Sequence, residues 1–205
     1  MELSQFFAFL SASIILTLAP GPDILYLLST SLSSGWRSGA MLALGLCSGL
    51  IFHTFLVACG VAAIIQASPF LFSLLKYAGA GYLLYLAYGS LNARGSLPLA
   101  ASIAPNPRGS LYRRGLVMNI LNPKVLIFFL AFLPQFIDSR RGDVTGQILL
   151  LGFIFGLQAY SIFLALSFLS KFVRKKILTL PNFPRLMNRI QATTLLAISL
   201  LLLFS

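Results

Sequence analysis

Long apolar segments separated by short polar connectors run along almost the whole chain. Six stretches are nearly free of Asp, Glu, Lys and Arg: Leu3 to about Ser33, Ser38 to Leu75, Tyr77 to Ala93, Gly115 to Ile137, Val144 to Ser170 and Ile190 to Ser205. A helix that crosses a bilayer needs about 20 apolar residues. The last stretch is short, so we expect its helix to start near Leu186, with Arg189 reaching toward the membrane surface. The pattern predicts six membrane spans, and five spans plus a buried tail is the alternative.

The composition excludes an ordinary water-soluble protein. Of the 205 residues, 58% are apolar and only 9% are charged, whereas soluble domains carry roughly 25% charged residues. The net charge of +11 could indicate a nucleic-acid partner. However, the charges are confined to short connectors between apolar runs, as a membrane surface requires. We therefore expect a multi-pass protein surrounded by membrane lipid, with no nucleic-acid partner.

The basic residues predict the orientation of the spans. Three fall on one side of the six predicted spans, namely Lys76, Arg140 and Arg141, and eleven fall in the connectors of the other side: Arg37, Arg94, Arg108, Arg113, Arg114, Lys171, Arg174, Lys175, Lys176, Arg185 and Arg189. The positive-inside rule places the larger group in the cytoplasm and both termini outside. The first span could instead be a cleaved signal peptide, but Glu2 and the Ala19-Pro20 pair favour a retained helix.

A connector rich in proline and glycine, from about Asn92 to Tyr112, divides the chain in two. We expect a single membrane domain over residues 1–205, made of a three-helix repeat (1–91), a cytoplasmic linker (92–112) and a second three-helix repeat (113–205). Because each half has an odd number of spans, the two halves are inverted relative to each other. The predicted fold is thus an all-α polytopic membrane protein of six helices in two inverted repeats.

The first helix of each half carries a matching interruption. One is Pro20-Gly21-Pro22-Asp23, and the other is Asn122-Pro123-Lys124. Proline removes a backbone hydrogen bond and clashes with the preceding turn, so such a break in a span is costly unless it lines a cavity. Proline also favours the first position of a helix, which predicts that Gly21 and Asn122 cap new half-helices starting at Pro22 and Pro123. A simple proline kink is the alternative.

Two charged residues, Asp23 and Lys124, lie at matched positions beside these breaks. A charge inside a span costs about 2.5–3.5 kcal/mol on insertion scales and is functional by default. Asp23 suits the positive end of its half-helix dipole, which by itself could explain its presence. Lys124 opposes its own half-helix dipole and needs another reason: an ion pair with Asp23, contact with a substrate carboxylate, or snorkelling toward water.

Other polar residues in the spans are weaker candidates. Asn119 lies one turn before the second break and is a candidate substrate contact. His53, the single histidine, either bonds to a neighbouring helix or relays protons. Glycines four residues apart, Gly45 with Gly49 and Gly152 with Gly156, predict close helix packing within one chain or between two copies. We find no pattern for a catalytic, metal or cofactor site, and no cysteine lies near either break, which argues against thiol chemistry.

Several motifs resemble the lysine exporter superfamily of bacterial amino-acid exporters, especially its homoserine and threonine exporter type. The resemblance runs nearly end to end, and it rests on these segments: Ala19 to Asp23, Gly35 to Gly39, Leu44-Gly45 with Gly49, Leu75 to Leu86, Arg114-Gly115 through Asn119, Asn122 to Lys124 and Leu133 to Phe136. The resemblance implies a carrier of the bacterial inner membrane that exports amino acids or close derivatives, driven by the proton gradient. It does not identify the substrate.

The charges and the resemblance together give a working hypothesis. A zwitterionic amino acid binds between the two breaks, with its ammonium toward Asp23 and its carboxylate toward Asn122 and Lys124. Rocking of the two halves exposes the site alternately to each side. Asp23 is the candidate proton carrier, because a carboxylate that loses its cationic neighbour binds a proton more readily. The alternatives are a cation or metal efflux carrier, and an uncoupled channel or structural membrane subunit.

Overall fold

The computed structural model of the protein describes residues 3–61, 68–92, 108–138, 142–179 and 182–204, and within these ranges the secondary structure is helical. The elements in chain order are α1 (Leu3–Leu18), α2 (Pro22–Ser34), α3 (Trp36–Leu56), the π-helix η1 (Val57–Val61), α5 (Pro69–Asn92), α6 (Arg108–Ile120), α7 (Pro123–Ile127), the π-helix η2 (Phe128–Phe132), the 3-10 helix η3 (Leu133–Phe136), α8 (Val144–Thr179) and α9 (Phe183–Phe204). The expected all-α fold is confirmed.

Within the described residues, four helices are long and apolar enough to cross a membrane on their own: Trp36–Gly60, Phe70–Asn92, Val144–Phe172 and Arg185–Phe204. Two further spans are bent pairs of helices. Ser4–Leu18 meets Pro22–Ser34 at 59°, and Arg108–Ile120 meets Pro123–Phe136 at 49°. Counting each bent pair as one span gives six spans. Each half of the chain therefore has the same order, a bent span followed by two continuous helices.

Two predicted boundaries lie close to the observed ones. α9 begins at Phe183, near the expected start at Leu186, and α6 begins at Arg108, inside the range expected for the linker. Most of that linker, residues 93–107, lies outside the described residues.

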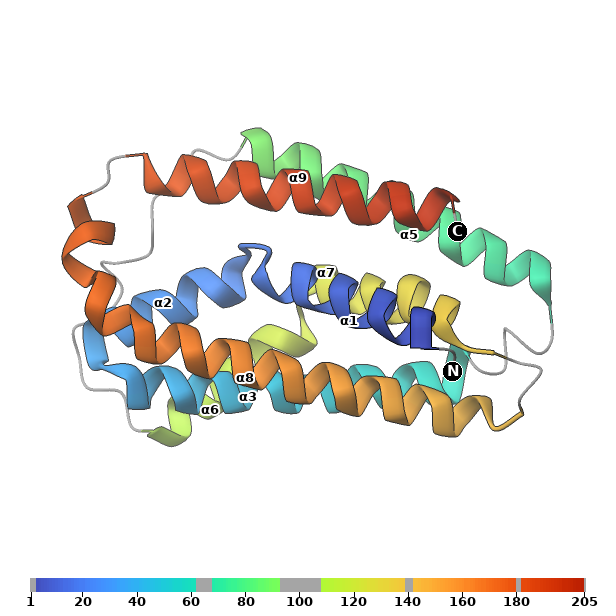
Figure 1. The fold of residues 1–205 in the computed structure, drawn as a ribbon, viewed down its shortest axis with the longest axis horizontal. Coiled ribbons are helices and arrows are strands. Elements are labelled where there is room, and N and C mark those ends of the chain that lie inside the picture. Colours follow the sequence, from blue (N-terminus) through green and yellow to red (C-terminus); the bar gives the residue numbers. More distant parts are fainter. Residues whose placement is uncertain (1–2, 62–67, 93–107, 139–141, 180–181, 205) are drawn as a thin grey trace.

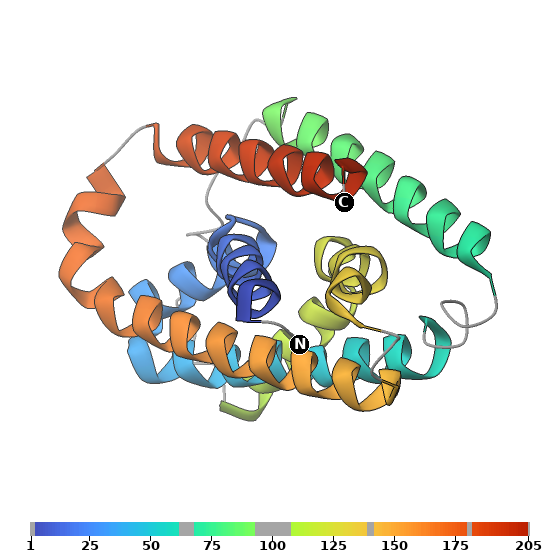
Figure 2. The same ribbon diagram turned by 45° about the vertical axis from the view of Figure 1, so that its right-hand side comes forward.

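The helices form three layers, with α1 and the α7–η2 half of the second bent span in the middle, while α6 packs against α3 (Figure 1). α5 and α9 pack together on one side, and α3 and α8 pack together on the other. Figure 2 shows α1 and α7 between these two pairs. The main apolar core joins all three layers through buried residues of each, including Leu83, Leu16, Phe128, Phe155 and Leu195. Both helix breaks therefore lie inside the protein, between two layers of continuous helices.

The outer surface is apolar, whereas polar side chains lie inside. Phe70, Phe153 and Phe204 are 75%, 68% and 87% exposed. By contrast, Asp23, His53 and Lys124 are among the buried side chains. Water-soluble proteins do not expose apolar surface on this scale, so the solvent of this surface is lipid.

Glycine brings α3 and α6 into close contact. A Cβ atom built at Gly45 would collide with the carbonyl oxygen of Tyr112, and one at Gly115 would collide with the carbonyl oxygen of Leu42. Gly49, one turn beyond Gly45, leaves room for the side chain of Asn119. The glycines of α3 therefore allow close helix packing within the chain, which was one of the two predicted alternatives; the other was packing between two copies.

The glycines at the matched positions of α8 are packed differently. A Cβ at Gly152 would collide with the Thr54 side chain, whereas one at Gly156 would meet nothing within 4 Å. Gly156 instead lines an apolar groove of about 360 Å³ between α3 and α8. The two halves thus share an order of elements but not a set of contacts.

We expect Gly45→Ala to destabilise the protein by about 1–3 kcal/mol, because the new methyl group overpacks the α3–α6 contact. The measurement is thermal unfolding of the purified protein in detergent. Gly156→Ala is the matched control, since its methyl group enters open space, and alanine favours a helix over glycine by about 0.5–1 kcal/mol. Equal destabilisation by the two substitutions would contradict this account of the α3–α6 contact.

Candidate functional site at the two helix breaks

The first break lies between α1 and α2, at residues 19–21. Pro22 is the first residue of α2, a position whose N–H has no partner within the helix and which therefore suits proline. Gly21 is the N-cap of α2 and has an extended conformation. A Cβ at Gly21 would lie 2.6 Å from Asp23 Oδ1 and 3.2 Å from Lys124 Nζ. Glycine is therefore required here by the close approach of two charged groups rather than by its backbone angles.

The second break lies between α6 and α7. α6 ends at Ile120 and α7 begins at Pro123. Asn122 caps α7, and its Oδ1 accepts a hydrogen bond from the backbone N–H of Lys124 at 3.1 Å. Both half-helices thus start where the sequence predicts, and the caps Gly21 and Asn122 are buried.

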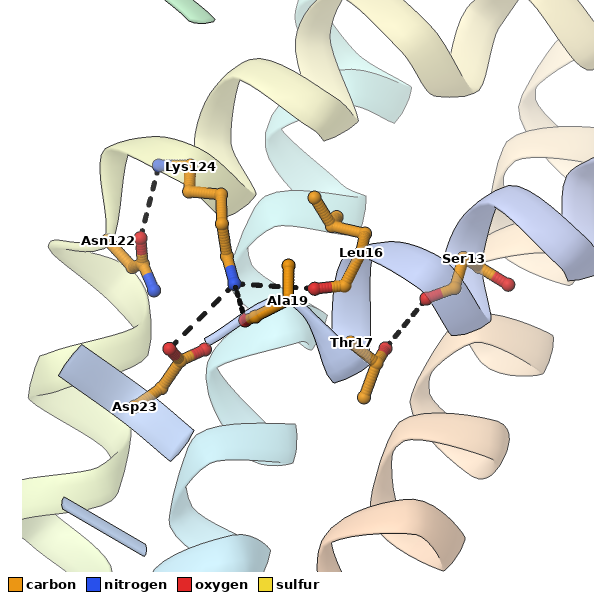
Figure 3. Close-up of polar contacts among 7 residues, drawn as sticks. All are labelled: Ser13, Leu16, Thr17, Ala19, Asp23, Asn122 and Lys124. Carbon is orange, nitrogen blue, oxygen red and sulfur yellow. Dashed lines mark hydrogen bonds and ion pairs between the residues drawn. The ribbon is translucent and has the colours of Figure 1, made fainter. Parts of the chain in front are cut away.

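Asp23 and Lys124 meet between the two breaks (Figure 3). Lys124 Nζ lies 3.9 Å from Asp23 Oδ1, and the two residues are 3% and 4% exposed, respectively. The same ammonium donates hydrogen bonds to the carbonyl oxygens of Ala19, at 3.0 Å, and Leu16, at 3.3 Å. Lys124 therefore points into the protein and does not snorkel toward the membrane surface.

These two carbonyls explain why a lysine can occupy this position. Leu16 lies in the last turn of α1, where its carbonyl accepts the Ala19 N–H at 3.2 Å and Pro20, four residues on, has no N–H to offer. Ala19 lies just beyond the helix, where carbonyl groups lose their helical partners. The negative end of the α1 dipole also favours a cation. Lys124 opposes the dipole of its own half-helix but completes the end of a helix from the other half, 105 and 108 residues away in the sequence.

Two more contacts hold the breaks to the continuous helices. His53 Nε2 on α3 lies 3.0 Å from the carbonyl oxygen of Asn119, in the last turn of α6. Gln158 on α8 donates from Nε2 to Thr17 Oγ1 of α1 at 2.9 Å. Histidine as a partner for a neighbouring helix was one of the two predicted alternatives. Neither partner was predicted, because no sequence pattern shows which carbonyl or hydroxyl a polar side chain will reach.

A cavity of about 20 Å³ opens beside the ion pair. Its polar wall is formed by Asp23, Lys124, Asn119 and Thr17, and its apolar wall by Leu16, Leu50, Val125, Phe155, Ala159 and Phe163. A space of this size holds about one water molecule, whereas pockets for small molecules measure about 300–1,000 Å³. The breaks thus border a small cavity with one polar wall, which is too small for an amino acid in this conformation.

Five buried polar atoms have no hydrogen-bond partner among the described residues: Asp23 Oδ1, His53 Nδ1, Asn119 Oδ1, Asn122 Nδ2 and Gln158 Oε1. Unsatisfied buried polar groups are rare in native proteins, and each costs about 1–3 kcal/mol. Their concentration around the two breaks makes this region the candidate site. Among the described residues, no three His, Cys, Asp or Glu side chains gather to hold a metal ion.

The fold and this site define a membrane transporter built on broken helices. Broken spans that meet at mid-membrane around buried charges are the architecture by which secondary transporters form their binding sites. The chain belongs to the family of LysE type translocators, whose family model matches residues 14–205. The resemblance seen in the sequence motifs is therefore confirmed, and it places the chain among transporters rather than enzymes.

Two named relatives are about a third identical to this chain over the aligned residues. It is 35% identical to the homoserine/homoserine lactone efflux protein of Salmonella typhi over 152 residues, which are 74% of this chain and 73% of that protein. It is 36% identical to the leucine efflux protein of Salmonella choleraesuis (strain SC-B67) over 138 residues, 65% of this chain and 64% of that protein. No solved structure matches the chain significantly.

We expect Lys124→Met to destabilise the protein by about 3–5 kcal/mol, because it leaves the buried Asp23 carboxylate without its cation. Asp23→Asn should cost less, since the ammonium of Lys124 keeps the two carbonyls of α1. The double variant should recover part of the loss in thermal unfolding measurements. A Lys124→Met protein as stable as the unsubstituted one would show that the pair does not hold the breaks together.

Proposed function

We propose that the protein exports amino acids or close derivatives from the bacterial cytoplasm, and that the substrate binds between the two helix breaks as a zwitterion. The observation that carries this proposal is the character of the unsatisfied atoms. Asp23 Oδ1 and Asn119 Oδ1 are acceptors, whereas Asn122 Nδ2 is a donor on a side chain whose oxygen accepts the backbone N–H of Lys124. The breaks thus offer partners of both kinds, as a molecule with an ammonium and a carboxylate requires. The efflux functions named for the two relatives support the same substrate class.

The ammonium of the substrate takes the acceptor side of the site. Three N–H donors of an α-ammonium match Asp23 Oδ1, Asn119 Oδ1 and the hydroxyl oxygen of Thr17, all of which line the cavity. The carboxylate takes the Lys124 ammonium and the free Nδ2 of Asn122. Asn122 cannot turn its amide oxygen toward the substrate without giving up its bond to the Lys124 N–H.

Transport requires a second conformation, because the cavity beside the ion pair is too small for an amino acid. The unequal packing of matched glycines supports an alternating cycle. Gly45 and Gly49 hold α6, whereas the matched Gly156 of α8 faces an open groove. In the alternate state α1 packs against the glycines of α8 as α6 leaves those of α3, so that the two halves exchange roles.

Coupling and direction complete the proposal. Asp23 carries the coupled proton, since substrate that engages Lys124 weakens the contact between that ammonium and the carboxylate. The excess of basic residues on one side places both termini in the periplasm. Proton entry would then accompany amino-acid exit.

Counterflow in proteoliposomes tests the function directly. Purified protein is reconstituted with unlabelled amino acids inside, and uptake of the matching labelled compound is followed over time. We expect saturable counterflow of at least one neutral amino acid, and at least a tenfold loss in Asp23→Asn. Asp143→Asn is the matched control, because Asp143 is exposed at the start of α8 and asparagine can also cap that helix. Folded protein without counterflow of any amino acid would overturn the proposal.

The alternating cycle predicts a separate effect for Gly156→Leu. A leucine side chain would occupy the groove between α3 and α8, so substrate should still stabilise the protein against heat while counterflow falls at least tenfold. Gly81→Leu on α5 is the control, since a side chain there also enters open space but lies outside the groove. Normal counterflow in Gly156→Leu would exclude movement of α1 onto this face of α8.

A further inference from the structure

His53 is completely buried in the last turn of α3 and reaches across to the second break. Its Nε2 lies 3.0 Å from the carbonyl oxygen of Asn119. A carbonyl oxygen only accepts hydrogen bonds, so His53 donates from Nε2 and its other nitrogen, Nδ1, carries no proton in the neutral ring. The same carbonyl accepts the backbone N–H of Asn122 at 2.9 Å. His53 therefore binds the carbonyl at which α6 turns into the break.

The surroundings of the ring suit a fixed neutral histidine. The Phe52 ring of α3 and the Phe129 ring of η2 lie 5.7 and 5.8 Å from it, measured between ring centroids. Nδ1 has no hydrogen-bond partner among the described residues. With aromatic rings beside it and a single bond to a carbonyl, the side chain is held in one orientation.

Asn119 is held by α3 from two directions. Its carbonyl oxygen bonds to His53, and its side chain fills the space left by Gly49, where a Cβ atom would lie 2.6 Å from Asn119 Oδ1. Gly49 and His53 are four residues apart, and so they lie on the same face of the helix. The amide of Asn119 in turn lines the polar cavity beside Asp23 and Lys124.

We propose that His53 is a positioning residue of the transport site: through the Asn119 carbonyl it fixes the end of α6 and sets the Asn119 amide at the cavity. It is the counterpart of Lys124, which fixes the end of α1 from the other half. The role needs a hydrogen-bond donor at this place and no change of protonation. The consequence for transport rests on the proposed function, whereas the effect on the α6 end does not.

The test compares His53→Gln, which keeps an N–H donor, with His53→Leu, which removes it. In counterflow, His53→Leu should raise KM about five- to tenfold with a smaller effect on the maximal rate, and His53→Gln should restore KM to within about twofold. The matched control is Thr54→Val, since the buried Thr54 hydroxyl donates to the Leu50 carbonyl of its own helix. Equal loss of counterflow in His53→Leu and His53→Gln would overturn the positioning role in favour of proton transfer. Unchanged counterflow in both variants would exclude any role of His53 in transport.

Hydrogen–deuterium exchange gives a readout that does not depend on transport. Peptides covering residues 115–127 should exchange faster in His53→Leu than in His53→Gln or Thr54→Val, because the α6 end has lost its partner. If His53→Leu does not fold, Gly49→Ala displaces Asn119 from its other side and should raise KM in the same way. Unchanged exchange in His53→Leu, or unchanged KM in a folded Gly49→Ala, would overturn the inference. If the unsubstituted protein shows no counterflow, but residues 115–127 still exchange faster in His53→Leu than in His53→Gln, only the proposed function is contradicted.

Discussion

The structure depends on how it satisfies the backbone groups that a broken helix leaves without partners and without water inside a membrane. At the first break, the buried ammonium of Lys124 supplies these partners. The carbonyls at the end of α1 lie where the helix stops supplying N–H partners, and Pro20 has none to give. Lys124 supplies two hydrogen bonds to them from the opposite half of the chain. Because the ammonium also faces Asp23 at the start of α2, one side chain joins both sides of the first break to the second.

The close packing of α3 and α6 follows from the same need at the second break. The Asn119 carbonyl can be reached from α3 only if the two helices approach closely, and Gly45 and Gly115 permit this approach. Each broken helix is thus completed by a donor from the other half, a lysine in one case and a histidine in the other. The two halves share an order of helices, while the contacts that complete each broken helix differ between the halves.

Much of this arrangement can be predicted from the sequence, for identifiable physical reasons. Pro22 and Pro123 lack an N–H, so both half-helix starts were predicted, and the caps Gly21 and Asn122 lie where the prolines require them. The spans follow from apolar length. Two features could not be predicted. The acceptors of Lys124 are backbone carbonyls, which every residue carries, and the partner of His53 depends on how far α3 and α6 approach. Because the glycine motifs have the same pattern in α3 and α8, the pattern could not show that only one of them holds a broken helix.

The charge balance of the site connects these contacts to the proposed transport cycle. Asp23 and Lys124 together carry no net charge, and a zwitterion placed between them adds none. Carrying such a substrate through the protein therefore avoids moving net charge into a medium of low dielectric constant, where an uncompensated ion is expensive. A cationic substrate would leave a net positive charge beside the Lys124 ammonium, which is already held at the end of α1. In the proposed cycle the same ammonium both bonds to the end of α1 and faces the substrate, so the contacts at the break would favour neutral amino acids over basic ones.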